Sequence, residues 1–276
     1  MTDKDDEIKG ARGISGKGIY SREKIMIKKL MAANWKMFKT WEEARQTARE
    51  LVVAVGSSLP GDREVLLIPP FTALRGVVEM LAGEDGYFLG GQNFYPEVQG
   101  AFTGEISPDQ LLDAGCTYAL VGHSERRHVL GEKDDFLARK VVFGLEKGLK
   151  IILCIGEKIE ERKEGRIQEV LTRQLEMGLE KTDKDVPAMD LVVAYEPVWA
   201  IGTGETAELE DISHAHGFIR SRLKEMLSQG DQVRILYGGS VKPDNCQSII
   251  GLDNVDGVLV GGASLKADSF SQIVLA

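Results

Sequence analysis

Two residues of this sequence, Glu196 and His123, have the type and the surroundings of a proton-transfer pair. Glu196 follows the apolar run Leu191–Tyr195, and His123 follows the run Tyr118–Gly122. A carboxylate that loses its water becomes a stronger base, and an imidazole can donate to a substrate oxygen or move a proton. Taken singly, a loop-capping glutamate and a structural histidine are the alternatives, so the interpretation requires the two side chains to meet.

The segment after Glu196 favours a catalytic role for this glutamate. It is apolar, starts with a proline and ends near a glycine, which is typical of a stiff lid with a hinge. We expect the lid to comprise Pro197, Val198, Trp199, Ala200, Ile201, Gly202 and Thr203.

A lysine and two glycine pairs are suited to holding an anion. Lys36 follows the run Leu30–Trp35, and two later runs are followed by Gly238-Gly239-Ser240 and by Gly261-Gly262. Backbone N–H groups without side-chain bulk, beside a short helix expected near Ala263, form a cradle for phosphate. Each glycine pair alone is equally typical of a turn. Together with the base, the histidine and the lid, they indicate proton abstraction next to the carbonyl of a small phosphorylated sugar.

Charge and cysteine content exclude several other classes of protein. The chain has 276 residues, with 34 Lys and Arg against 43 Asp and Glu and a formal charge of −9. Nucleic acids and anionic membranes are held by an excess of basic residues, and no apolar run approaches the roughly 20 residues that cross a bilayer. Cys116, Cys154 and Cys246 form no CxxC pair and lie near no histidine cluster. We therefore predict no nucleic-acid or membrane partner, no metal site and a reduced cytoplasmic location.

Eight short aliphatic runs alternate with longer amphipathic stretches, which predicts eight parallel strands with helices between them. Because the runs lack polar alternation, both faces of each strand should be covered. We expect strands at Leu30–Trp35, Glu64–Ile68, Tyr87–Gln92, Tyr118–Gly122, Lys150–Ile155, Leu191–Tyr195, Val233–Tyr237 and Gly257–Val260, and helices at Trp41–Val55, Asp109–Ala114, Asp134–Lys147, Ile159–Glu180, Glu208–Ser228 and Pro243–Ile250. Thr40 with Glu43 and Ser107 with Pro108 are start signals for two of these helices. The charged stretch Glu157–Arg166 is expected to be the solvated first half of its helix.

Eight such units favour an α/β fold with a single (βα)8 barrel and a parallel eight-stranded core over an open doubly wound sheet. No GxGxxG fingerprint follows the first strand, which removes the main support for a dinucleotide-binding sheet. In a barrel the C-terminal ends of all strands form one rim, so Lys36, His123, Glu196, Ser240 and Gly261 should converge there.

We divide the chain into two parts. Residues 1–24 are rich in Gly, Lys and Asp, lack the apolar stretch of a secretory signal, and are more acidic than a transit peptide. We expect them to form a flexible N-terminal extension, and residues 25–276 to form the barrel.

Six segments of the sequence resemble the signature motifs of a known family. They are Asn34-Trp35-Lys36-Met37, Gly100-Ala101-Phe102-Thr103-Gly104-Glu105, Val121-Gly122-His123-Ser124-Glu125-Arg126-Arg127, Ala194-Tyr195-Glu196-Pro197-Val198-Trp199-Ala200-Ile201-Gly202-Thr203-Gly204, Tyr237-Gly238-Gly239-Ser240-Val241 and Val260-Gly261-Gly262-Ala263-Ser264-Leu265. In this order they are similar to the triosephosphate isomerase family, and the resemblance covers everything except the N-terminal extension.

The resemblance implies interconversion of dihydroxyacetone phosphate and D-glyceraldehyde 3-phosphate in glycolysis and gluconeogenesis, through an enediol(ate) and without metal or organic cofactor. By similarity, Glu196 is the catalytic base and His123 is a neutral group that polarises the carbonyl. Lys36 and Asn34 bind substrate near the reacting carbons, and Glu125 helps to organise the site. The phosphate contacts implied by the resemblance are Gly202, Ser240, Gly261 and Gly262.

The resemblance also implies a homodimer. In the family, a loop after the third strand reaches into the neighbouring subunit, and here it would run from Asn93 to Glu105 with Thr103 at its tip. Phe94, Tyr95 and Phe102 in this segment would make a poor free surface if they were exposed. A tetramer is left open.

Two other functions fit the same scaffold, because a fold does not determine a reaction. One is another phosphosugar isomerase or an aldolase, but an aldolase needs a buried Schiff-base lysine, and strands five to seven offer Lys150 alone, at the start of its strand. The other is a non-catalytic barrel, which would be expected to lack the base, the histidine or the lid.

Overall fold

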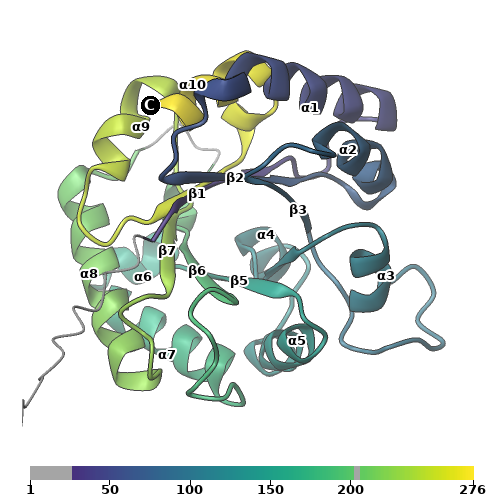
Figure 1. The fold of residues 1–276 in the computed structure, drawn as a ribbon. Coiled ribbons are helices and arrows are strands. Elements are labelled where there is room, and N and C mark those ends of the chain that lie inside the picture. Colours follow the sequence, from purple (N-terminus) through teal and green to yellow (C-terminus); the bar gives the residue numbers. More distant parts are fainter. Residues whose placement is uncertain (1–26, 202–205) are drawn as a thin grey trace, which may run out of the picture.

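The computed structural model describes residues 27–201 and 206–276, in which eight parallel strands close into one barrel (Figure 1). The predicted N-terminal extension, residues 1–24, lies outside the described residues, as do Gly202 and Thr203 of the predicted lid. The predicted (βα)8 barrel is confirmed.

The strands pair in sequence order, and the last strand pairs with the first. They are β1 (Lys29–Asn34), β2 (Arg63–Ile68), β3 (Tyr87–Gly91), β4 (Tyr118–Val121), β5 (Lys150–Ile155), β6 (Leu191–Tyr195), β7 (Arg234–Tyr237) and β8 (Gly257–Val260). Their limits differ from the predicted ones by no more than one residue at either end.

Helices surround this ring of strands (Figure 1). They are α1 (Trp41–Val55), α2 (Leu74–Leu81), α3 (Pro108–Asp113), α4 (Ser124–His128), α5 (Asp134–Glu146), α6 (Ile159–Lys163), α7 (Ile167–Leu179), α8 (Leu209–Met226), α9 (Pro243–Ile250) and α10 (Ala267–Leu275), with short 3-10 turns η1 (Gly56–Ser58), η2 (Phe71–Ala73), η3 (Val198–Ala200) and η4 (Gly262–Ser264). Figure 1 shows α10 beside α1, so the two ends of the helical ring meet. Within the described residues, no helix has the length and apolar character needed to cross a bilayer.

Side chains of each strand alternate between the barrel interior and the surrounding helices. In β1, Leu30 and Ala32 belong to the interior cluster, whereas Met31 and Ala33 belong to the cluster that packs under the helices. The same alternation carries Asn34 to the C-terminal end of the interior row. Val192 and Ala194 in β6 are also interior residues, and Glu196 is the next residue of that row.

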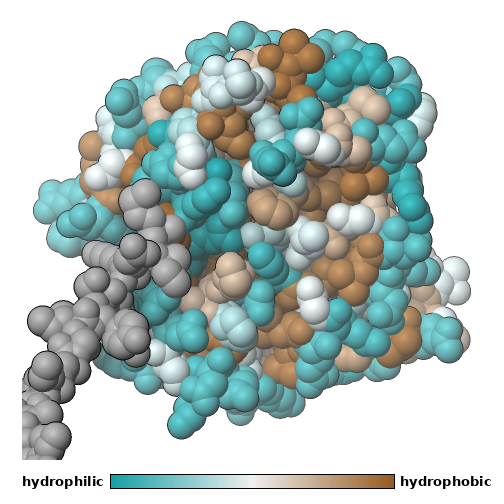
Figure 2. All heavy atoms as spheres, in the orientation of Figure 1, coloured by the Kyte–Doolittle hydropathy of each residue, from teal (hydrophilic) through white to brown (hydrophobic). Residues whose placement is uncertain are grey.

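Helices α1 and α3 start where the capping signals predict. The Thr40 hydroxyl accepts a hydrogen bond from the Glu43 backbone, and the Glu43 carboxylate accepts one from the Thr40 backbone, so both free N–H groups at the start of α1 are satisfied. Ser107 and Gln110 form the same reciprocal pair ahead of Pro108. The helices turn their polar faces outward, and in Figure 2 hydrophilic residues dominate the outline while groups of hydrophobic residues lie between them.

Three expectations about the elements are wrong. The single helix predicted over Ile159–Glu180 is two helices, α6 and α7, because Gly165 has a left-handed φ of +71° that ends the first one. Helices α2, α4 and α10 were not predicted. Glu157, expected on a solvated helix face, is completely buried ahead of α6.

The segment between β3 and α3 extends outward from the barrel (Figure 1). Phe94, expected to be exposed there, is fully buried beside Gly144 of α5. Tyr95 packs its ring 4.3 Å from that of Phe102, which is 39% exposed. The apolar surface of this segment is therefore smaller than predicted.

Candidate active site

A pocket of about 560 Å³ lies at the C-terminal ends of the strands. It brings together all the predicted site residues that the structure describes and that were expected to touch substrate, namely Asn34, Lys36, His123, Glu196, Ser240, Gly261 and Gly262. Ala200 and Ile201 of the predicted lid also line it. The predicted phosphate contact Gly202 lies outside the described residues.

Glu196 and His123 are in direct contact in this pocket. Glu196 Oε1 lies 3.0 Å from His123 Nε2, and Glu196 Oε2 accepts a hydrogen bond of 2.9 Å from the backbone N–H of Ser124. Both side chains are buried. The end of β4 and the start of α4 thus hold the carboxylate that follows β6.

Burial and partners act in opposite directions on Glu196. Burial raises the pKa of the Glu196 carboxyl, but the contact with His123, the N–H of Ser124 and the charge of Lys36 together outweigh it, so this pKa is lowered from its ordinary value. The desolvation expected from the sequence is present, yet Glu196 is held in its charged form.

The ring of His123 is oriented by the start of α4. Its Nδ1 accepts a hydrogen bond of 3.3 Å from the backbone N–H of Glu125, so the proton of the neutral ring is on Nε2 and faces Glu196. Burial lowers the pKa of His123, but the contact with Glu196 raises it by more, so this pKa is above its ordinary value while the contact lasts. Apart from Glu196, burial and the nearby charge of Lys36 favour the neutral ring, and they are opposed by the Glu125 carboxylate, which lies 3.5 Å from Nδ1 and raises the pKa.

Lys36 is held in a strained turn after β1. Its φ of +49° is uncommon for a lysine. Its backbone N–H donates to Asn34 Oδ1 at 3.0 Å, and its carbonyl accepts from Gln92 Nε2 at 2.7 Å. Its ammonium lies 2.8 Å from Glu125 Oε1, which fits the predicted supporting role of Glu125. Gln92, at the end of β3, was not singled out as a site residue.

The N-terminal part of the predicted lid is anchored to Glu157, a second residue not expected at the site. The indole N–H of Trp199 donates to Glu157 Oε1 at 2.8 Å, and the N–H of Val198 donates to the Glu157 carbonyl at 3.1 Å. The hydroxyl of Tyr195 also donates to Glu157 Oε1, at 3.2 Å. Burial raises the pKa of this carboxyl above its ordinary value.

The glycine segments that follow β7 and β8 also line the pocket. A Cβ on Gly238 would lie 2.9 Å from Glu196 Cγ, so only glycine lets the backbone pass this close to the carboxylate. Gly261 and Gly262 lead into η4, whose first N–H groups have no acceptor within the turn. Lys242, which precedes α9, lines the same pocket and was not predicted.

Metal-ligand residues do not gather at this site. In residues 27–201 and 206–276, no group of three His, Cys, Asp or Glu side chains is placed to hold a metal ion. The arrangement offers a charged carboxylate, an imidazole N–H, an ammonium and free backbone N–H groups, which suits acid–base chemistry on an anionic substrate.

The chain matches known proteins of one family over the whole barrel. A family model described as triosephosphate isomerase matches residues 29–276. The chain is 57% identical over 251 residues to the triosephosphate isomerase of Nitratidesulfovibrio vulgaris (strain DP4) and 55% identical to that of Oleidesulfovibrio alaskensis. Each alignment covers 91% of this chain and 100% of the relative.

A solved structure is also similar. The crystal structure of triosephosphate isomerase from Bartonella henselae has a TM-score of 0.81 and 37% sequence identity to this chain. The match covers 90% of this chain and 98% of that one.

Proposed function

The chain belongs to the triosephosphate isomerase family, and from this premise we propose which of its residues carry out the reaction. The enzyme interconverts dihydroxyacetone phosphate and D-glyceraldehyde 3-phosphate, a step of glycolysis and gluconeogenesis. The observation that carries our assignment is the 3.0 Å contact between the buried Glu196 carboxylate and His123 Nε2, in the pocket that also contains Lys36 and the glycine segments.

We propose that Glu196 is the catalytic base. It removes a proton from the carbon next to the carbonyl of dihydroxyacetone phosphate, and the electron pair left on that carbon moves to form the enediolate. Glu196 then returns the proton to the neighbouring carbon, which yields glyceraldehyde 3-phosphate. To do this, the carboxylate turns from His123 and Ser124 towards the substrate.

We assign the stabilisation of the enediolate to His123, Lys36 and Asn34. The N–H on His123 Nε2 is free to donate to the substrate oxygens once Glu196 has turned away, and it can move a proton between them. The ammonium of Lys36 offsets the developing negative charge. The attraction between these two charges is stronger in a buried site than in water. The side chain of Asn34 holds the Lys36 turn in place.

We assign the binding of the phosphate to Ser240, Gly261 and Gly262, with Gly202 of the lid as a further contact. Backbone N–H groups at the start of a short helical turn favour an anion. When the lid of residues 197–203 closes, it removes water from the enediolate, whose elimination of phosphate would otherwise compete.

Isotope incorporation tests the reaction and the role of His123 together. Purified protein is incubated with dihydroxyacetone phosphate in heavy water, and the products are followed by proton NMR. We expect glyceraldehyde 3-phosphate labelled at the carbon next to its carbonyl, and His123→Gln should lower the rate by about 10² to 10⁴. Turnover of a different sugar phosphate in place of this one would favour another phosphosugar isomerase, and no turnover would favour a non-catalytic barrel.

We propose that the enzyme is a homodimer joined through the segment from Asn93 to Glu105, with Thr103 reaching towards the partner. Its supports are apolar side chains exposed near the pocket and on this segment: Met37 is 95% exposed, Phe38 54% and Val98 48%. Sedimentation should give about twice the monomer mass of 30.3 kDa. A monomer at micromolar concentration, unchanged by Thr103→Glu, would refute the assignment.

We also propose a cytoplasmic location without nucleic-acid or membrane partners. The formal charge of −9 and the three free, buried cysteines support it. Cell fractionation tests the proposal, since recovery of the protein with membranes or with the periplasm would contradict it.

A further inference from the structure

The proposed phosphate cradle depends on η4, a turn of three residues. Gly261 and Gly262 lie at its pocket end, and Ser264 and Leu265 lie at its carbonyl end. Two hydrogen bonds hold the turn itself, from Ser264 N to the Gly261 carbonyl at 2.9 Å and from Leu265 N to the Gly262 carbonyl at 3.2 Å. A turn this short can tilt unless its far end is fixed, because it has few bonds of its own.

Two donors from the segment between β1 and α1 fix that far end. The indole N–H of Trp35 donates to the Ser264 carbonyl at 3.1 Å, and the ammonium of Lys39 donates to the Leu265 carbonyl at 2.8 Å. The donors therefore bind consecutive carbonyls of the turn. The same segment carries Lys36, so these bonds connect the part of the site that binds the reacting carbons to the part that binds the phosphate.

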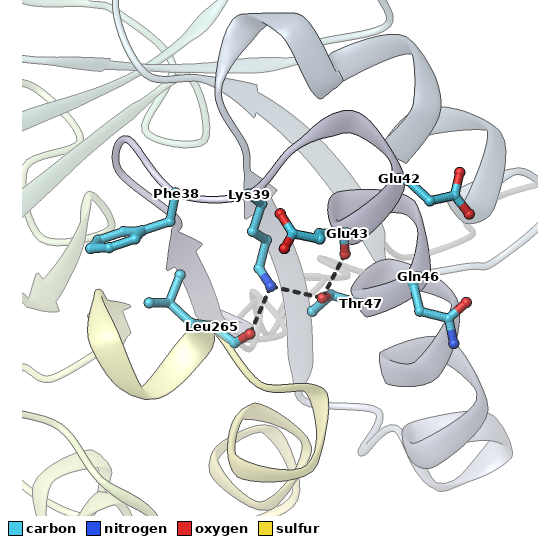
Figure 3. Close-up of a pocket in the computed structure, with 7 residues that line it drawn as sticks. All are labelled: Phe38, Lys39, Glu42, Glu43, Gln46, Thr47 and Leu265. Carbon is cyan, nitrogen blue, oxygen red and sulfur yellow. Dashed lines mark hydrogen bonds between the residues drawn. The ribbon is translucent and has the colours of Figure 1, made fainter.

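Lys39 is itself held from three sides. Its ammonium donates to Thr47 Oγ1 at 2.8 Å, and the Thr47 hydroxyl in turn donates to the Glu43 carbonyl at 2.8 Å (Figure 3). Because the hydroxyl proton is directed at Glu43, a lone pair of Thr47 Oγ1 accepts from Lys39. The ammonium also lies 5.3 Å from the centre of the Trp35 ring. Figure 3 shows Lys39 directed inward between α1 and η4, whereas Glu42 and Gln46 point away from it.

The backbone conformation of Lys39 is energetically unfavourable for a lysine. Its φ of +76° is uncommon for any residue except glycine, asparagine and aspartate. Burial lowers the pKa of its ammonium, although Glu43 and Glu50 oppose the shift. A residue with backbone strain and a partly dehydrated charge is expected where its contacts have a function.

We propose that Lys39 is a positioning residue for phosphate binding, whose ammonium, braced by Thr47, fixes the carbonyl end of η4 and so keeps the N–H groups of Gly261 and Gly262 directed at the phosphate. The inference rests on the proposed function, because it deepens the assignment of the phosphate site. Lys39 acts through the turn and is not assigned a contact with the substrate.

Lys39→Met tests the proposal, because methionine keeps most of the side-chain length and removes the donor. We expect KM for glyceraldehyde 3-phosphate and the inhibition constant of inorganic phosphate to rise together, by about tenfold, as for the loss of a charge-assisted hydrogen bond. With glyceraldehyde, which has no phosphate, kcat/KM should stay within about twofold of wild type. A loss of general folding would instead lower turnover of both substrates.

Three further variants sharpen the test. Lys39→Arg should restore most of the phosphate affinity, since a guanidinium can donate to the same carbonyl. Thr47→Val removes the brace and should raise the phosphate inhibition constant by a smaller factor. Lys266→Met is the matched control, because it makes the same change in an exposed lysine next to Leu265, and it should behave as wild type.

Unchanged inhibition by phosphate in Lys39→Met, or equal losses with both substrates, would overturn the proposal. If Lys39→Met does not fold, Thr47→Val decides, and an unchanged phosphate inhibition constant there overturns it too. A wild-type protein that neither isomerises glyceraldehyde 3-phosphate nor is inhibited by phosphate would contradict the proposed function instead.

Discussion

At the scale of single residues, the partners of Glu196 determine when it can act as a base. In the arrangement described, His123 and the N–H of Ser124 keep the carboxylate charged in spite of its burial. In the mechanism that we propose, the carboxylate leaves both partners when it turns to the substrate, and burial then raises its pKa with less opposition. On this proposal, Glu196 stays charged before the substrate binds and becomes a stronger base when it accepts the proton.

His216 gives a prediction for stability against pH. It is fully buried in α8, its Nδ1–H donates to the Asn254 carbonyl at 2.8 Å, and burial lowers its pKa to about 4 from 6.5. Between these two pH values the unfolded chain binds more protons than the native one. The free energy of unfolding should therefore fall as the pH is lowered from about 7 to 4, by roughly 3 kcal/mol from this residue.

Urea unfolding at several pH values measures this contribution. His216→Gln removes the titrating group and should reduce the loss of stability on acidification. His214→Gln, in an exposed position of the same helix, is the control and should retain the wild-type pH dependence. The same pH dependence in both variants would show that His216 does not carry the effect.

Residues that directly follow a buried strand could be predicted from the sequence. Glu196 and His123 were found in this way, because the C-terminal ends of parallel strands meet at one rim. Gln92 also directly follows its strand, yet neither it nor Glu157 was singled out, because their roles depend on contacts with Lys36 and Trp199, which are distant in the chain. Adjacent sequence gives no signal for such pairings.

At the scale of elements, the carboxylate of the buried Glu157 connects the start of the proposed lid to the barrel. Glu157 Oε1 accepts from Trp199 of the lid and from Tyr195 of β6. Loss of either donor removes one hydrogen bond from the same acceptor, but only Trp199 belongs to the proposed lid, whereas Tyr195 belongs to β6. Substituting each donor in turn therefore distinguishes an effect on the proposed lid from an effect on the barrel core.

Trp199→Phe should lower kcat severalfold while the protein stays folded, because the lid loses a fixed point at its start and each hydrogen bond of this kind is worth about 1 kcal/mol. Tyr195→Phe should lower the free energy of unfolding by about 1 kcal/mol, the value of the lost hydrogen bond, and leave kcat close to wild type. Steady-state kinetics and urea unfolding of both variants measure this. Equal effects on kcat would mean that Glu157 acts through the core alone.

Strand positions were predictable because buried parallel strands are continuous apolar runs bounded by polar residues. Helix α2 was not, since it follows Pro69-Pro70 and η2 without a capping side chain. The break between α6 and α7 depends on one glycine conformation, at Gly165, within an otherwise helical pattern. Phe94 is buried by α5, a neighbour that its own segment does not reveal.

At the scale of the whole molecule, an acidic protein must attract an anionic substrate. The formal charge is −9, and the phosphate of the substrate carries between one and two negative charges near pH 7. Lys242 is exposed at the mouth of the pocket. We expect the positive charge of Lys242 to offset the repulsion between the acidic protein and the anionic substrate at short range, where salt screens the attraction least.

Lys242→Gln should lower kcat/KM roughly threefold at low ionic strength, and the deficit should shrink as salt is added, because screening weakens the lost attraction. Lys181→Gln changes the net charge equally, in the loop between α7 and β6 at the other end of the barrel. This control should stay near wild type at every salt concentration. Equal deficits in the two variants would assign the effect to net charge.

The whole account rests on Glu196 as the base that meets the substrate. The most direct test is kcat for glyceraldehyde 3-phosphate with Glu196→Gln, which keeps the shape of the side chain but cannot accept the proton. We predict a loss of about 10³, with the inhibition constant of inorganic phosphate unchanged, so that the pocket is shown to be intact. A variant that keeps more than a tenth of wild-type turnover would contradict the account.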